Sequence, residues 1–320
     1  MTPSPVSVVL PTFNSGQLVV QAVESVLSQT LPVTEIIVVD DGSTDDTAAQ
    51  LARYGDKVRY LPQLNQGVSA ARNLGVSAAS QEFVAFLDAD DVWHPRKMEL
   101  QLPVFARHPE LGLLGTTFFD WPSEQFPVLN GGSTEPNFVS WSRLVVKNSL
   151  ATSSIVVRRH LLERAGPFDR AIQGPEDRDL WLRVAELAPI ANLDLPLMGY
   201  RDVPGSVSKQ AERCEAGMIR ILKKLDERKV WGGRWLLRRR AYSYVYHSCA
   251  YLHGAAGRYG RSLSRSAKSF CWYPLPYSKH EAEIDWERPK RFLVNLLRLA
   301  GLKSPDAPVP LPPASCGAAQ

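Results

Sequence analysis

The chain has 320 residues, of which 44% are hydrophobic and 22% are charged, as is ordinary for a soluble globular protein of one large or two moderate domains. No apolar run reaches the ~18 residues of a membrane-spanning helix, so a membrane-spanning protein is excluded. The net charge of +4 is unevenly distributed: residues 1–208 hold 16 basic and 24 acidic side chains, and residues 209–303 hold 21 and 8. This asymmetry indicates two different roles for the two parts.

The N-terminus and the cysteines indicate a cytoplasmic protein. Met1 to Pro5 has neither the basic region nor the apolar core of a signal peptide. The cysteines are widely spaced and form no C-x-x-C pair, so we expect reduced structural thiols and no cysteine metal site. They are Cys214, Cys249, Cys271 and Cys316.

Strands and helices alternate through the first part of the chain. Hydrophobic periodicity predicts strands at 6–10, 35–39, 58–61 and 82–87, and helices at 17–29, 43–54 and 67–79. Ser43 followed by Asp46 has the spacing of a capping box for the second helix. Short connections predict a mainly parallel sheet with helices on both faces. No G-x-G-x-x-G follows the first strand, which argues against a dinucleotide-binding fold.

Weaker patterns continue downstream. We expect a helix at 93–107 bent at Pro103, a loop at 120–137, and strands at 111–117, 152–157, 190–193 and 197–200. Pro175 and the acids after it mark the start of another helix. Beyond residue 208 the pattern is helical, and the stripe of Trp235, Tyr242, Tyr246, Cys249 and His253 predicts one packed helix face. Residues 304–320 are rich in Pro and Ala, which predicts disorder.

Three carboxylates follow the strand at 82–87 within four positions: Asp88, Asp90 and Asp91. Ionised carboxylates repel one another, so such a cluster indicates a cation between them. Hard oxygen ligands suit Mg²⁺ or Mn²⁺, which usually also hold substrate phosphates. The alternative for a bare D-x-D is a solvated acidic turn that caps a helix. Its position favours a ligand site, because ligands of open α/β sheets bind outside the carboxyl ends of the strands.

Four further features accompany this cluster. Pro11-Thr12-Phe13-Asn14 ends the first strand, Asp40-Asp41-Gly42-Ser43 ends the second, Arg72 lies in the third helix, and Glu176-Asp177 follows far downstream. Each could be structural alone, as turn residues or surface ion pairs. Together, in this order, they make residues 5–208 resemble the family-2 glycosyltransferases. The resemblance implies the α/β GT-A (nucleotide-diphospho-sugar transferase) fold for residues 1–208, followed by a basic α-helical region at 209–303 and the tail at 304–320.

The resemblance also implies roles for individual residues. Phe13 falls where the family packs an aromatic ring on the nucleotide base, Asp41 with Asp40 falls where an acid reads the base or ribose, and Arg72 falls where a basic side chain contacts the nucleotide. The implied donor-binding set is Pro11, Thr12, Phe13, Asn14, Asp40, Asp41, Arg72, Asp88 and Ala89.

The remaining roles concern the metal and the reaction. The resemblance implies that Asp90 and Asp91 hold Mn²⁺ or Mg²⁺, that Asp177 is the catalytic base of an inverting transfer, and that Glu176 and Trp181 support it. A cation would neutralise the leaving diphosphate, and a carboxylate would take the proton of the attacking hydroxyl. The implied partners are a nucleotide-sugar donor and a glycan or lipid-linked acceptor. The base-binding residues resemble a uridine site, which implies a UDP-linked sugar.

Two departures from the family pattern limit these implications. The segment starting Tyr200-Arg201-Asp202-Val203 has Val203 where the family often has His, so the resemblance does not imply a metal or phosphate contact at this position. No Q-x-x-R-W motif follows Asp177. Without that motif and without membrane spans, transfer of one sugar per encounter is favoured over a processive synthase of cell-surface polysaccharide.

Other interpretations remain open. A nucleotidyltransferase acting on sugar phosphates would need a Gly-rich, Arg-containing loop after the first strand, and an inactive scaffold would not need every acidic position filled. The basic C-terminal part alone suggests nucleic acid, but its aromatic residues have the spacing of a helical core. We therefore expect no nucleic-acid partner. The segment at 290–299 is either a short helix on an anionic membrane surface or a helix packed on the catalytic domain.

Overall fold

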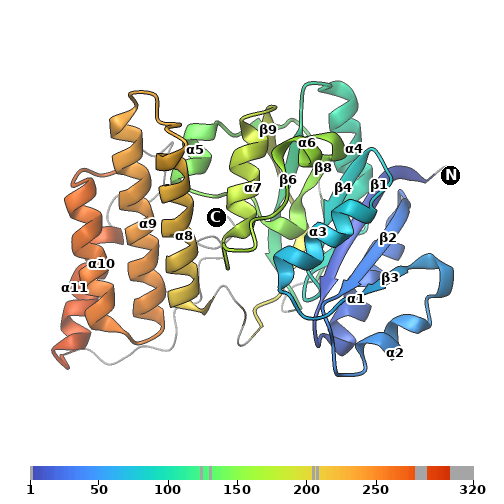
Figure 1. Cartoon of the computed structure of the whole chain (residues 1–320), viewed down its shortest axis with the longest axis horizontal. Coiled ribbons are helices and arrows are strands. Elements are labelled where there is room, and N and C mark those ends of the chain that lie inside the picture. The colour runs from blue at the N-terminus through green and yellow to red at the C-terminus, as the bar shows by residue number, and fades with distance from the viewer. Residues whose placement is uncertain are drawn as a thin grey trace.

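The computed structural model describes residues 3–122, 125–129, 132–203, 206, 209–277 and 287–302. These residues form a sheet domain joined to a bundle of helices (Figure 1). The strands are β1 Ser4–Thr12, β2 Val33–Asp40, β3 Arg59–Pro62, β4 Phe83–Phe86, β5 Val92–Trp93, β6 Leu113–Asp120, β7 Asn137–Phe138, β8 Val156–Arg158 and β9 Ile190–Tyr200. Within the described chain they make one nine-stranded sheet in the order β3-β2-β1-β4-β8-β6-β9-β5, with β7 paired to β9.

The sheet is mixed and mainly parallel, as the alternation of elements predicts. β1 runs parallel to β2 and β4, β2 parallel to β3, and β6 parallel to β9. β8 is antiparallel to both β4 and β6, and β5 is antiparallel to β9. The carboxyl ends of β1, β2 and β4 therefore meet at one edge, where the predicted site residues follow each strand.

Helices cover both faces of the sheet. Successive apolar side chains of β1 point to opposite faces, so each face carries its own hydrophobic core. The helices of this part are α1 Gly16–Leu27, α2 Thr47–Ala52, α3 Val68–Ala78, α4 Lys97–Arg107, α5 Trp141–Val146, α6 Arg159–Ala165 and α7 Glu176–Ala185, with 3-10 turns η1 Gly55–Lys57 and η2 Thr152–Ser154. Val8 and Leu10 pack with α1 and α4, and Val9 packs with α3 and α7. Gly75 lets α3 approach closely, since a Cβ there would lie 2.4 Å from Cγ1 of Val9.

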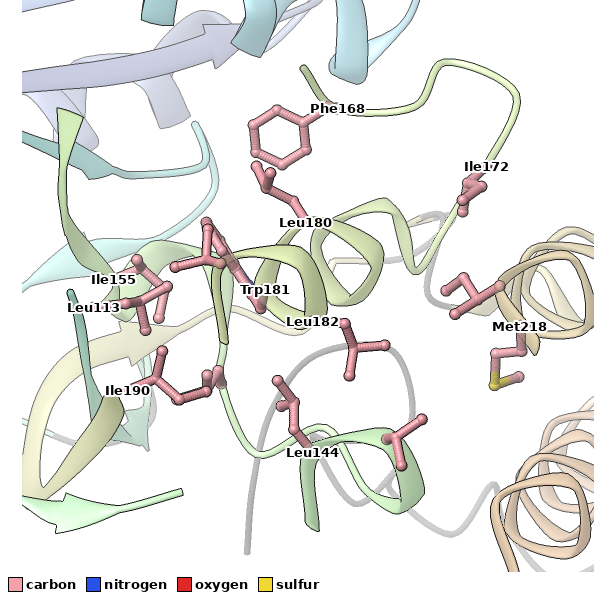
Figure 2. Close-up of a cluster of buried hydrophobic side chains, with 14 of the residues drawn as sticks. Leu113, Leu144, Ile155, Phe168, Ile172, Leu180, Trp181, Leu182, Ile190 and Met218 are labelled. Atoms are coloured by element: carbon pink, nitrogen blue, oxygen red, sulfur yellow. The ribbon is translucent and has the colours of Figure 1, made fainter. Parts of the chain in front are cut away.

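The core on the α3 and α7 face of the sheet continues into the C-terminal helices. Figure 2 shows Trp181 and Leu182 of α7 between sheet residues such as Leu113 on one side and Met218 on the other. Met218 belongs to α8 Ala211–Glu227, which is followed by α9 Trp235–Ala255, α10 Tyr259–Trp272 and α11 Glu287–Leu299. The basic helical region thus shares a hydrophobic cluster with the sheet domain. The tail expected at 304–320 lies outside the described residues.

Several local predictions were wrong. Trp93 lies in strand β5, and the helix begins later, at Lys97. The strand expected at 152–157 starts as η2, in which Ser154 bonds the carbonyl oxygen of Ala151 instead of a neighbouring strand. The strands expected at 190–193 and 197–200 are the single strand β9, whose register against β6 shifts between them.

The predicted caps and the aromatic stripe also need correction. α2 begins at Thr47 after Asp46, with no side-chain cap, so the capping box from Ser43 does not form. In α9, Cys249, His253 and Tyr242 are buried, but Trp235, the first residue of the helix, is 67% exposed and is not part of that core. The short elements α5, α6, β5 and β7 were not predicted at all. Among the described residues, no helix combines the length and the apolar character that crossing a bilayer requires.

Candidate active site

The turns that follow β1 and β2 are bound to each other. Phe13 follows β1 and is 48% exposed, so its ring is free to contact a ligand. Asn14 has a positive φ of 48°, and its side-chain oxygen accepts a 2.7 Å hydrogen bond from the main-chain N–H of Thr44. Pro11 and Thr12 are buried in the strand, and the main-chain oxygen of Thr12 accepts from the N–H of Asp41. Pro11 and Thr12 are therefore held within the sheet, directly before the turn that carries Phe13.

Asp40 and Asp41 are buried and hydrogen bonded within the protein. Oδ1 of Asp40 accepts from the N–H of Ser43 at 2.8 Å, and Oδ2 accepts from the hydroxyl of Tyr60 at 2.6 Å. The carboxylate of Asp41 accepts from three donors of the loop before α3, at 2.6 to 2.8 Å. These donors are the side chain of Gln63 and the main-chain N–H groups of Gln66 and Gly67. Both acids thus fix the loops around the predicted base site, and their contact with a nucleotide stays a prediction.

Arg72 joins two site motifs that are far apart in the sequence. Its side chain is 4% exposed; Nη2 lies 2.6 Å from Oδ1 of Asp88, and Nη1 lies 2.7 Å from Oε1 of Glu176. The guanidinium also lies 5.5 Å from the ring centre of Phe168. Arg72 therefore connects the carboxyl end of β4 with the start of α7, in addition to any contact that it makes with a nucleotide.

The acidic cluster after β4 contains three differently held carboxylates. Asp91 is buried; its Oδ2 accepts from the hydroxyl of Ser153 at 2.6 Å, and its Oδ1 accepts from the N–H of Arg201 at 3.2 Å. Asp88 is held by Arg72, as described above. Among the described residues, the carboxylate of Asp90 forms no ion pair and no hydrogen bond with another side chain, although its own main-chain N–H donates to it and the charges of Arg201 and Arg72 act on it. Burial and the charge of Asp88 raise the pKa of Asp90 to about 6.

This arrangement fits a divalent cation that is bound mainly by a substrate. The described residues contain no group of three or more His, Cys, Asp or Glu side chains that would form a complete protein metal site. Asp90 is instead a single unpaired hard ligand beside two further carboxylates. Mg²⁺ and Mn²⁺ commonly use one or two carboxylates and take their other ligands from phosphates and water. The donor set therefore fits a cation carried with a diphosphate, with Asp90 as its main protein ligand and Asp91 beside it.

Asp177 lies in the first turn of α7, where the helix dipole favours a negative charge. Its Oδ2 accepts from the hydroxyl of Thr152 at 3.0 Å, and its Oδ1 accepts from the N–H of Arg178 at 2.6 Å. Burial and the neighbouring charge of Glu176 nevertheless raise the pKa of Asp177 to about 7. A carboxylate with such a pKa can hold and release a proton near neutral pH, which is what a general base requires.

Glu176 and Trp181 have supporting positions. Oε2 of Glu176 accepts from the N–H of Gly174 at 2.9 Å, while its other oxygen binds Arg72. Trp181 is fully buried, with its ring 5.8 Å from that of Phe86 at the end of β4. Ala89 is buried between two of the acids. These buried residues support the acidic motifs at the end of β4 and the start of α7.

The structure adds site residues that sequence reasoning missed. In η2, Thr152 bonds Asp177 and Ser153 bonds Asp91, so one turn connects the predicted base with the acidic cluster. Arg201 donates from Nε to the carbonyl oxygen of Asp90 at 2.9 Å. The sequence signal for Thr152 and Ser153 is the run of hydroxyl side chains at 152–154, which the hydrophobic pattern assigns to a strand. Arg201 lies in the segment compared with the family pattern, but that comparison gives it no role.

The bridging role of Arg72 makes a prediction for stability. Arg72→Met keeps the length of the side chain but leaves two carboxylates without their cation, so we expect a loss of about 3–5 kcal/mol in the free energy of unfolding. Arg72→Lys should lose less, because an ammonium keeps the charge but cannot reach both acids in this forked geometry. Urea unfolding measures both variants.

Arg59→Met is the matched control for Arg72. Arg59 pairs with Glu35 at 3.4 Å, but its side chain is 52% exposed. Exposed pairs contribute about 0–1 kcal/mol, so this variant should unfold nearly as the unmodified protein does. Equal stability of Arg72→Met and Arg59→Met would show that the Asp88–Arg72–Glu176 bridge is not structural.

Comparisons with known proteins agree with this geometry. Residues 7–130 match the family model described as Glycosyl transferase family 2. An uncharacterized glycosyltransferase of Nostoc sp. strain PCC 7120 is 35% identical over 175 residues, which cover 51% of this chain and 54% of that protein. The Escherichia coli UDP-Glc:alpha-D-GlcNAc-diphosphoundecaprenol beta-1,3-glucosyltransferase WfgD is 27% identical over 186 residues, covering 56% of this chain and 69% of that protein.

A solved structure shows the fold. The crystal structure of S. aureus TarS 1-349 in complex with UDP-GlcNAc matches with a TM-score of 0.54 at 19% identity, covering 85% of this chain and 93% of that chain. The architecture is therefore GT-A-like, with a C-terminal helical region. The chain spans about half the length, or less, of the first curated relatives that it matches, with 43%, 39% and 54% of them covered. Residues 7–130 are therefore similar to glycosyl transferase family 2, and the fold of the chain is similar to that of TarS.

Proposed function

We propose that this protein transfers one sugar from a UDP-linked donor to a hydroxyl group of a glycan or lipid-linked glycan, with inversion and with Asp177 as the general base. The main support for the proposal is that η2 donates hydrogen bonds to acids of two different motifs. Thr152 holds Asp177 and Ser153 holds Asp91, so an acid with a raised pKa and a candidate phosphate–metal site lie on either side of one three-residue turn.

The chemistry requires these two groups to be close together. In an inverting transfer, the acceptor hydroxyl attacks the anomeric carbon while the bond to the diphosphate breaks. The hydroxyl loses its proton as it attacks, and Asp177 can accept it because its pKa is raised to about 7. Arg72 stays charged between Asp88 and Glu176 and holds both sides of the site in register.

A divalent cation on Asp90, Mn²⁺ or Mg²⁺, would neutralise the charge that develops on the leaving diphosphate. The protein's own contribution there is to keep Asp90 unpaired and correctly placed. Arg201 binds the main-chain oxygen of Asp90, and Ser153 holds the adjacent Asp91. The loop is therefore fixed before any ligand binds.

The substrates are inferred from the site and from the relatives. TarS was solved in complex with UDP-GlcNAc, and the printed name of WfgD gives UDP-Glc as donor and a diphosphoundecaprenol-linked sugar as acceptor. The ligand of TarS and the donor of WfgD both support a UDP-sugar as the donor of this protein, and the acceptor of WfgD supports a lipid-linked acceptor. The exposed ring of Phe13 beside the loops fixed by Asp40 and Asp41 is where we place the uracil base.

The donor assignment predicts a nucleotide preference. The thermal shift produced by UDP with Mn²⁺ should exceed those with GDP or dTDP, because the base pocket is expected to fit a pyrimidine without the thymine methyl group. A donor screen that scores release of nucleoside diphosphate then identifies the sugar. Equal or larger shifts with GDP would contradict the uridine assignment, and pyrophosphate release from a sugar phosphate and a nucleoside triphosphate would identify a nucleotidyltransferase instead.

A further inference from the structure

Helix α11 and the turn after it expose four leucines, while two polar residues of the same helix are buried. Leu293, Leu296 and Leu299 are 55%, 44% and 56% exposed, and Leu302 just beyond the helix is 76% exposed. In the same helix, Arg288 and Asn295 are 4% and 2% exposed. A helix of a water-soluble protein normally has the reverse arrangement. We name Leu293, Leu296, Leu299 and Leu302 the leucine stripe.

Specific contacts fix this orientation. Arg288 donates to the carbonyl oxygen of Tyr273 at 2.7 Å and lies 4.5 Å from the ring centre of Phe270. Asn295 donates to the hydroxyl of Ser262 at 2.8 Å. Turning the leucines inward would break these contacts and leave buried polar groups unpaired. The outward leucine stripe is therefore a property of the packed helix.

The position of α11 also matters. Figure 1 shows it at the end of the molecule opposite β2 and β3, on the outer side of the helical bundle. Among the described residues, its main contacts are with α10 and α9, including the guanidinium of Arg291, 4.2 Å from the ring centre of Tyr251. The alternative expectation for 290–299, packing on the catalytic domain, is therefore wrong. The helix packs on its own bundle and leaves the leucine stripe accessible.

We propose that the leucine stripe is a docking surface for an anionic lipid bilayer. Exposed apolar rows mark interaction sites, and a helix with an apolar outer face and basic residues beside it is suited to lie in the headgroup region. The net charge of the surrounding elements is complementary to anionic lipids: α10 and α11 together contain seven basic residues and one acidic residue. They are Arg261, Arg265, Lys268, Arg288, Lys290, Arg291, Arg298 and Glu287. Of the basic residues, Arg288 is buried, and Arg261 and Arg265 pair with Glu212 and Glu215 of α8.

A second copy of the chain fits this surface less well. A stable protein interface buries ~800 Å² on each partner, and four partly exposed leucines on one narrow row provide much less apolar area. A positively charged bundle would also repel its own copy. Lipid headgroups have the opposite charge, and a bilayer accepts a narrow apolar row without requiring a matching surface.

Vesicle co-sedimentation of the full chain tests this proposal. We expect binding to vesicles of equal parts phosphatidylglycerol and phosphatidylcholine at low salt, weaker binding at high salt, and little binding to phosphatidylcholine alone. The double variant Leu293→Gln/Leu296→Gln should lower the partition coefficient by about 10-fold or more, because less apolar surface enters the bilayer. Lys290→Gln should reduce the preference for the anionic vesicles.

Leu64→Gln is the matched control, because Leu64 is 85% exposed and lies in the sheet domain. It should bind vesicles as the unmodified protein does, and the circular dichroism melting curves of all variants should agree, since every substituted side chain is exposed. Absence of binding to anionic vesicles, or equal binding by the double variant, would overturn the proposal. So would a dimer, detected by analytical ultracentrifugation, that the double variant abolishes. The assay contains no sugar donor, so its outcome is independent of the proposed transferase activity.

Discussion

Asp177→Asn is expected to lower the rate of sugar transfer by at least ~10²–10⁴-fold, the usual contribution of a general base. The amide keeps the size of the side chain and its place in the first turn of α7, but it cannot accept a proton. The affinity for UDP with metal should barely change, because Asp177 acts on the acceptor side. For the unmodified protein, kcat/KM should rise with pH up to about 7, the pKa of Asp177.

The same variant should be more stable than the unmodified protein at neutral pH. The pKa of Asp177 is raised from an ordinary 3.8 to about 7, so the folded state binds this proton more tightly than the unfolded state does. The resulting stability is present in full below pH ~4 and is lost as the pH rises through about 7. Asp177→Asn removes the ionisable group, so the variant should not lose this stability as the pH rises. Urea unfolding at pH 5 and pH 8 should therefore show a smaller pH dependence for the variant.

Two neighbours on α7 serve as controls. Glu176→Gln should affect transfer less than Asp177→Asn, since Glu176 binds Arg72 and the Gly174 N–H. Asp179→Asn removes a buried carboxylate that lies 2.8 Å from Arg183 and 2.9 Å from Lys224. It should lower stability and leave the turnover of the folded protein nearly unchanged. Near-normal transfer by Asp177→Asn together with loss of transfer in Glu176→Gln would move the base by one residue, and normal transfer in both would contradict this mechanism.

Asp90→Ala is expected to lower transfer by orders of magnitude and to remove the metal dependence of UDP binding. The alanine variant lacks the main protein ligand of the cation, so the charge developing on the diphosphate is no longer neutralised. Isothermal titration of UDP with and without Mn²⁺ measures the second effect. Arg72, Ser153 and Arg201 keep their other contacts, so the melting temperature should change little.

The matched comparison for Asp90 is Ser153→Ala. It removes the 2.6 Å hydrogen bond to Asp91 but leaves Asp90 in place. We expect weaker transfer that excess Mn²⁺ partly restores, whereas excess Mn²⁺ should not restore Asp90→Ala. Full activity of the unmodified protein in EDTA would contradict the cation hypothesis for this site.

The sequence alone determined the fold class, the resemblance to the family-2 glycosyltransferases and the strand ends at which the candidate site lies. Hydrophobic periodicity reports burial directly, so β1, β2 and β4 were located within a few residues and their parallel arrangement followed from the alternating helices. The polar residues after each strand, such as Asn14, Asp41 and Asp90, then had to meet at one edge of the sheet. These features depend on local pattern and chain order, both of which a sequence contains.

Tertiary structure alone decided which charged and hydroxyl groups meet. Arg72 contacts Asp88 and Glu176, the latter 104 positions away, and η2 bonds two acids from different motifs. Such contacts depend on how closely α3, α7 and the sheet pack, which no local pattern encodes. The same reason applies to α11: its spacing predicted an amphipathic helix, but only the packing of Arg288 and Asn295 on α9 and α10 determined that the leucines face outward.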